Sequence, residues 1–107
     1  MPYIIVQTRW PSEAIPAVVK KAIEVVAKYP QDESLGEQVV PNAVKATLDG
    51  IITMGVYLVK EGKFEEAMAR TIATMAMYGP VPGFEYSIET WATQEEAYGA
   101  IGQTPPE

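Results

Sequence analysis

The segment from Ala43 to Trp91 constrains the fold of this chain more than any other stretch. It begins with two apolar runs, Ala43–Leu48 and Ile51–Lys60, separated by Asp49-Gly50. An Asp-Gly pair between such runs is typical of a β-hairpin closed by a type I′ turn. A helix over Asn42–Leu48 is the alternative interpretation, because Ala, Lys and Leu favour helices. The turn signal makes the hairpin the preferred one.

A helix and a third strand follow the hairpin. The segment Lys63–Tyr78 places Phe, Met, Ile and Ala at helical spacing, and this Met-rich stripe is interpreted as core packing. Gly79 is well placed to adopt a left-handed conformation after the last turn. Phe84–Trp91 is the last long strand. Thr93–Glu96 matches a capping box, which predicts a short helix to about Ile101.

The first part of the chain predicts a strand and a helix. Tyr3–Trp10 is rich in β-branched and aromatic residues and is followed by the breaker Pro11. Ser12 is a suitable N-cap for a helix whose apolar residues recur at helical spacing as far as Tyr29. The polar segment Gln31–Gln38 is predicted to be a surface connection.

The order of these elements predicts an α+β protein of the ferredoxin-like βαββαβ class. We expect an antiparallel four-stranded sheet with two helices on one face, plus a short C-terminal helix. Right-handed crossovers place the first and third strands side by side and parallel, with the fourth antiparallel on the other flank of the first. One domain, residues 1–102, accounts for the pattern, and residues 103–107 are predicted to be a flexible tail.

Alternation along the strands assigns their side chains to the two faces of the sheet. The face covered by helices is expected to hold Ile4, Val6, Met54, Val56, Leu58, Phe84, Tyr86 and Ile88. The open face is expected to hold Tyr3, Ile5, Gln7, Arg9, Thr53, Tyr57, Val59, Glu85, Ser87, Glu89 and Trp91. Such a mixed face is too apolar to lie entirely in water, so we expect the chain to form a homodimer, or a higher homo-oligomer, through it.

Composition excludes several functions. Eight Lys and Arg against fourteen Asp and Glu give a net charge of −6, an acidic balance that disfavours nucleic-acid binding. The chain has no Cys and no His, which excludes thiolate or imidazole metal sites and imidazole bases. No metal site and no cofactor is predicted. Its apolar runs are too short for a membrane span, no signal peptide is recognisable, and a cytoplasmic location is expected.

The opening residues M-P-Y-I-I-V-Q-T-R-W-P resemble the first strand of the GYD-domain family, within the dimeric α/β-barrel (ferredoxin-like) superfamily. The similarity extends to the Asp49-Gly50 hairpin, the strand Gly55–Val59 and the closing W-A-T-Q-E-E. The resemblance implies the fold and a tendency to dimerise, in a superfamily that includes small-molecule sensors, monooxygenase-like and isomerase-like enzymes. The family's Gly-Tyr-Asp triplet has no counterpart here, so no functional residue is carried over.

The polar and aromatic residues of the open face are the candidate ligand-binding residues. They are Tyr3, Gln7, Arg9, Thr53, Tyr57, Glu85, Ser87, Glu89 and Trp91. Arg9 with Glu85 or Glu89 could orient an anionic or carbonyl ligand, and the aromatic rings could pack on a flat one. A cross-strand ion pair at a dimer rim, with the aromatic residues packing in the interface, is the favoured alternative.

These observations favour a small homodimeric ligand-binding or accessory module without catalytic activity, and no catalytic residue is assigned. One alternative is a cofactor-independent isomerase- or monooxygenase-like enzyme that uses Glu85 or Glu89 as acid–base group and Arg9 as electrostatic stabiliser. Another is a structural oligomerisation unit that binds no ligand.

Overall fold

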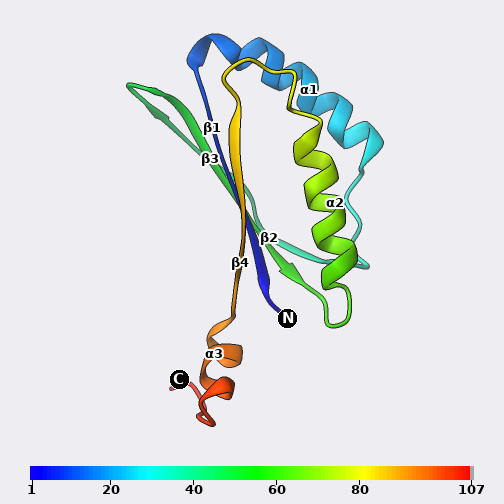
Figure 1. Cartoon of the computed structure of the whole chain (residues 1–107), viewed down its shortest axis with the longest axis vertical. Coiled ribbons are helices and arrows are strands. Elements are labelled where there is room, and N and C mark those ends of the chain that lie inside the picture. Colours follow the sequence, from blue (N-terminus) through cyan, green and yellow to red (C-terminus); the bar gives the residue numbers. More distant parts are fainter. Residues whose placement is uncertain (107) are drawn as a thin grey trace.

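The computed structural model describes residues 1–106 and has the predicted α+β architecture (Figure 1). Its elements are β1 (Tyr3–Trp10), a 3₁₀ turn (Ser12–Ala14), α1 (Ile15–Lys28), β2 (Gly36–Thr47), β3 (Gly50–Val59), α2 (Phe64–Ala76), β4 (Glu85–Trp91) and α3 (Gln94–Ala100). The order βαββαβ followed by a short helix is that of a ferredoxin-like fold. No helix in residues 1–106 is long and apolar enough to cross a membrane.

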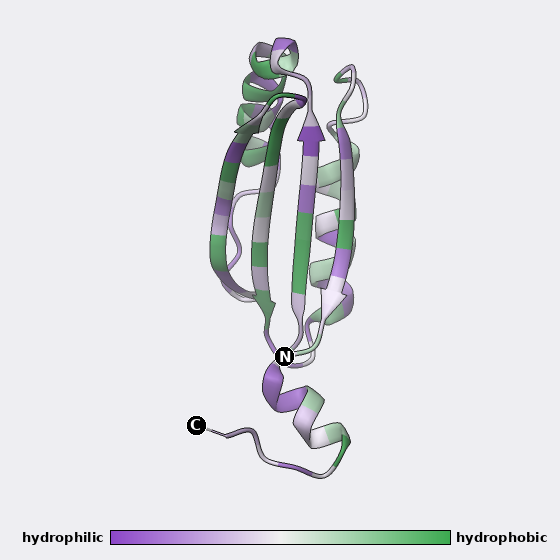
Figure 2. Cartoon of the chain, turned by 90° about the vertical axis from the view of Figure 1, so that its left-hand side faces the viewer, coloured by the Kyte–Doolittle hydropathy of each residue, from purple (hydrophilic) through white to green (hydrophobic). Residues whose placement is uncertain are grey.

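The sheet has the strand order β2-β3-β1-β4, and every neighbouring pair is antiparallel. The expectation that the first and third strands are parallel was therefore wrong. The crossover through α1 makes β2 parallel to β1, but the hairpin then reverses the chain, so β3 runs antiparallel to β1. Helices α1 and α2 lie on the same side of the sheet, and the other side has no helix over it (Figures 1 and 2).

The hairpin is confirmed, but its first strand begins much earlier than expected. β2 starts at Gly36, inside the polar segment predicted to be a surface connection, and no helix forms over Asn42–Leu48. β2 is an edge strand, whose solvent-facing positions accept polar side chains and a proline without loss of ladder hydrogen bonds. Pro41 lies in the irregular stretch where the register shifts between Val40 and Ala43.

Three local predictions need correction. The hairpin turn is not type I′. Thr47 pairs with Gly50, so Leu48 and Asp49 are the two turn residues, and type I′ needs a positive φ at both. Within residues 1–106 only glycines have a positive φ. Gly50, with φ 131°, takes the unusual conformation instead. Gly79 does not adopt a left-handed conformation. Gly83 does, with φ 76°, in the connection between α2 and β4. Ser12 caps no helix, because the chain first makes a 3₁₀ turn.

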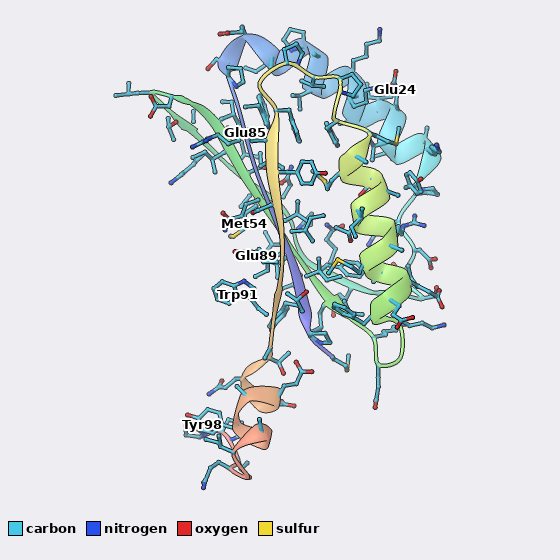
Figure 3. All side chains as sticks on the ribbon, viewed as in Figure 1. Glu24, Met54, Glu85, Glu89, Trp91 and Tyr98 are labelled. Atoms are coloured by element: carbon cyan, nitrogen blue, oxygen red, sulfur yellow. The ribbon has the colours of Figure 1, made fainter. Side chains whose placement is uncertain are left out.

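The register inverts the predicted faces of β3. Because directly opposite residues share a face, the pairs Ile4–Tyr57 and Thr8–Thr53 place Tyr57 and Thr53 under the helices. Ile52, Met54, Val56 and Leu58 consequently lie on the open face. Figure 3 shows Met54 on the same side of the sheet as Glu85, Glu89 and Trp91, away from the helices. The apolar run of β3 has no alternation that could have fixed its phase.

The short C-terminal helix α3 extends beyond the end of the sheet (Figures 1 and 2). Its capping box is confirmed: Thr93 Oγ1 accepts the Glu96 N–H at 3.1 Å, and Glu96 Oε1 accepts the Thr93 N–H at 2.9 Å. Glu96 also pairs with the N-terminal ammonium group at 3.0 Å. These contacts lower the pKa of Glu96, the backbone hydrogen bond from Thr93 having the largest effect.

Candidate functional site

A cavity of about 420 Å³ separates the helix-covered face of the sheet from α1 and α2. The buried core is split into two clusters, one around Ile4 and Val59 and the other around Trp10 and Val81. Ile4 and Trp10, from opposite ends of β1, both line the cavity. The space therefore lies where a domain of this kind usually has its continuous core, and its volume is in the range of ligand-binding pockets.

Small residues in the middle of the sheet create this cavity. Thr8, Thr53 and Gly55 form its floor, and Ala22, Ala67, Thr71 and Thr74 face it from the two helices. Gly55 has no neighbour that forbids a side chain: a Cβ built there would meet nothing closer than the Pro41 carbonyl oxygen at 3.5 Å. A glycine inside a strand weakens the strand and often marks a place where a ligand or another backbone comes close. Here it leaves room beneath the helices.

The two floor threonines form a hydrogen-bonded pair. Thr8 Oγ1 and Thr53 Oγ1 lie 2.5 Å apart, and both residues are buried. Only one of the two hydroxyl hydrogens can lie between the oxygens, and no other side-chain hydrogen bond of either residue occurs in residues 1–106. The pair explains why two polar residues occupy the buried face of adjacent strands, since a lone buried hydroxyl would be costly.

Replacing one member of this pair is expected to cost more than replacing both. Thr8→Val leaves the Thr53 hydroxyl without its partner, so the free energy of unfolding should fall by about 1–3 kcal/mol. The double variant Thr8→Val/Thr53→Val keeps the shape and removes both polar groups, so it should be close to wild type. Chemical denaturation of the wild type, the two single variants and the double variant measures this coupling; purely additive losses would contradict it.

One end of the cavity is aromatic. The Tyr78 and Phe84 rings stack with their centroids 4.6 Å apart and their planes 9° from parallel, and Trp10 lines the same cavity. Phe84 and Tyr78 both belong to the cluster around Trp10. Burial raises the pKa of the Tyr78 hydroxyl, which keeps it neutral. This end can pack against a flat or compact apolar group.

The other end is polar and is built by the α1–β2 connection, β3 and α2. The Tyr57 hydroxyl donates to the Asp32 carbonyl oxygen at 3.1 Å. Burial raises the pKa of Tyr57, the nearby Asp32 charge raises it further, and the Arg70 charge opposes them. Arg70 donates to the Pro30 carbonyl oxygen and lies 5.6 Å from the centre of the Tyr29 ring. Tyr57, Asp32 and Arg70 therefore form one polar group at the cavity wall.

The structure does not bring the predicted candidates together at one site. Thr53 and Tyr57 line the cavity, whereas Tyr3, Gln7, Arg9, Glu85, Ser87, Glu89 and Trp91 lie on the open face. There Arg9 pairs with Glu85 and not with Glu89: Nε and Nη2 donate to Glu85 Oε1 at 3.1 and 2.8 Å. Both side chains are more than half exposed, at 63% and 65%, so this is a surface ion pair at the end of the sheet. The Trp91 indole N–H donates to Glu89 Oε1 at 3.4 Å.

The sequence interpretation missed the residues on the helix side of the cavity and Gly55 on its floor. Arg70 and Thr74 lie among the Met and Ala residues of a helix that was interpreted entirely as core packing. Gly55 was the available signal, because a glycine inside the most apolar strand needs a reason. No group of three or more acidic residues in residues 1–106 is arranged to hold a metal ion.

Comparisons with protein-family models, curated proteins and solved structures find no match to this chain.

Proposed function

We propose that this protein is a homodimeric ligand-binding module that holds a small, mostly apolar molecule between its sheet and its helices. The observation that carries the proposal is the 420 Å³ cavity, which divides the core into two clusters. Most of the wall of this cavity is apolar, so an apolar occupant would remove that surface from water and stabilise the fold.

The proposed role is binding without catalysis. Asp32 is the carboxylate that lines the cavity in residues 1–106, and its Oδ1 accepts hydrogen bonds from the Ser34 N–H at 3.0 Å and from Ser34 Oγ at 2.5 Å. These bonds lower the pKa of Asp32 and hold its carboxylate toward its own loop. Thr71 and Thr74 donate their hydroxyl hydrogens to backbone carbonyl oxygens of α2. The wall is thus arranged to hold a ligand, and no acid–base pair is proposed.

The open face of the sheet is the proposed dimer interface. The inverted phase of β3 makes this face more apolar than the sequence predicted, because four aliphatic side chains, Ile52, Met54, Val56 and Leu58, occupy its centre. On β1 their partners are Arg9, Gln7, Ile5 and Tyr3. Exposed apolar faces of this kind usually bind another molecule, and a two-fold pairing of identical faces is the commonest arrangement. The resemblance to dimeric α/β-barrel proteins points to the same surface.

A titration with Nile red, a neutral apolar dye, tests the binding proposal. We expect saturable binding of one dye per chain, with a rise and a blue shift in dye fluorescence. Weak fluorescence that rises linearly with dye concentration would contradict the proposal. Light scattering on the same samples should give the mass of two chains.

A further inference from the structure

We infer that the natural ligand is an amphipathic monoanion, in which a compact apolar body carries one carboxylate that binds Arg70. This inference rests on the proposed ligand-binding function and adds the chemical class of the ligand. The two ends of the cavity differ as such a molecule requires, because one end is aromatic and the other contains a guanidinium group.

The Arg70 guanidinium group uses only part of its hydrogen-bonding capacity within the protein. Arg70 lies on α2, is half-buried, and lines the cavity. Its hydrogen bond to the Pro30 carbonyl oxygen uses one of the five N–H donors of a guanidinium group. The centre of the Tyr29 ring lies 5.6 Å from the guanidinium carbon, within the range of a cation–π contact. The remaining donors are free to bind a carboxylate.

Within residues 1–106, no carboxylate forms an ion pair with Arg70. Asp32 is close enough for the Arg70 charge to lower its pKa, but hydrogen bonds from Ser34 have the largest effect on that pKa and hold the carboxylate in its loop. A fixed, half-buried cation with spare donors is best satisfied by an anion that offers two acceptor oxygens.

The apolar body of the ligand would lie over the sheet and reach the aromatic end of the cavity, opposite Arg70. Thr8 and Thr53 form a hydrogen bond with each other, so only one hydroxyl hydrogen of the floor is unused where the floor faces apolar atoms. The stacked Tyr78 and Phe84 rings supply an apolar wall. A ligand that extends from these rings to Arg70 would bury its body and bring its carboxylate to the polar end.

Two fluorescent probes with the same body test the inference. Pyrenebutanoic acid carries a carboxylate at neutral pH, and pyrenebutanol carries a hydroxyl group in its place. We expect the wild type to bind the acid at least about tenfold more tightly than the alcohol, as a charge-assisted hydrogen bond allows. Arg70→Gln should weaken the binding of the acid and so reduce this preference to less than about twofold. Arg70→Lys, which keeps the charge without the planar fork, should retain part of the preference.

Arg9→Gln is the matched control, because Arg9 is the other arginine and lies on the open face in a pair with Glu85. It should leave the preference for the acid intact. If the wild type binds both probes equally, or if Arg70→Gln keeps the preference, the inference fails while the binding function stands. If the wild type binds neither probe, the binding function itself fails. Circular dichroism of each variant confirms that it is folded.

Discussion

Replacing Gly55 with leucine is expected to stabilise the fold and to abolish ligand binding. Most point substitutions destabilise a fold, but the space above Gly55 is open and the side chain would point into the cavity. A β-strand gains stability when glycine is replaced, and filling a cavity adds to this gain. Thermal or chemical denaturation should show a free energy of unfolding higher by about 1 kcal/mol or more. Nile red affinity should fall at least about tenfold, because the leucine occupies the ligand's space.

Gly36→Ala is the control, because Gly36 is also in a strand but has no room. Its Cβ would lie 2.2 Å from the Leu58 carbonyl oxygen and 2.7 Å from a ring carbon of Tyr57. This variant is expected to lose stability by about 1–3 kcal/mol, the usual cost of overpacking. If Gly55→Leu is destabilised in the same way as Gly36→Ala, the cavity is closed in solution and cannot receive a ligand. If it is stabilised and still binds the dye fully, the dye binds elsewhere.

Replacing Val56 with arginine is expected to separate the dimer into monomers. Val56 lies at the centre of the open face, between Ile5 on β1 and Val40 on β2. Pairing two such faces would bury an unpaired charge from each chain, which costs several kcal/mol and should raise the dimer dissociation constant at least about a hundredfold. Light scattering across a concentration series measures the change.

Val19→Arg is the matched control for the interface. Val19 is a valine of α1 that is 54% exposed on the opposite side of the molecule. It should leave the dimer intact. A dimer that resists Val56→Arg and dissociates with Val19→Arg would place the interface on α1, where Val19, Ile23 and Val26 form an exposed apolar strip. A wild-type protein that is monomeric throughout would remove the dimer from the proposal.

The sequence determined most of the architecture, because the strongest signals are local. The Asp49-Gly50 pair located the hairpin, and the Thr93–Glu96 pattern located the last helix and its capping box. The sequence did not determine the start of β2, because an edge strand tolerates the polar residues after Gly36 that elsewhere indicate a loop. The sequence also did not determine which alternate side chains of β3 point toward the helices, because its nearly continuous apolar run fits either assignment.

That single error of phase assigned two of the candidate residues to the wrong face of the sheet. Alternation placed Thr53 and Tyr57 among the polar residues of the open face, whereas the pairing of β3 with β1 puts both under the helices. The cavity itself depends on distances between α1, α2 and the sheet, which no local pattern records. Arg70 illustrates the limit: its partners, Pro30 and Tyr29, are forty or more positions away and become neighbours only in the fold.

The location of a bound ligand decides whether the cavity between the sheet and the helices is the binding site. In a methyl-labelled sample, the Leu and Val methyl signals can be followed by nuclear magnetic resonance during a titration with Nile red. We expect shifts at the cavity-lining Val6, Val18, Val25 and Leu35, with no change at Val40, Val56 and Leu58 of the open face. Shifts confined to the open face, or no saturable shift at any of these residues, would contradict this expectation.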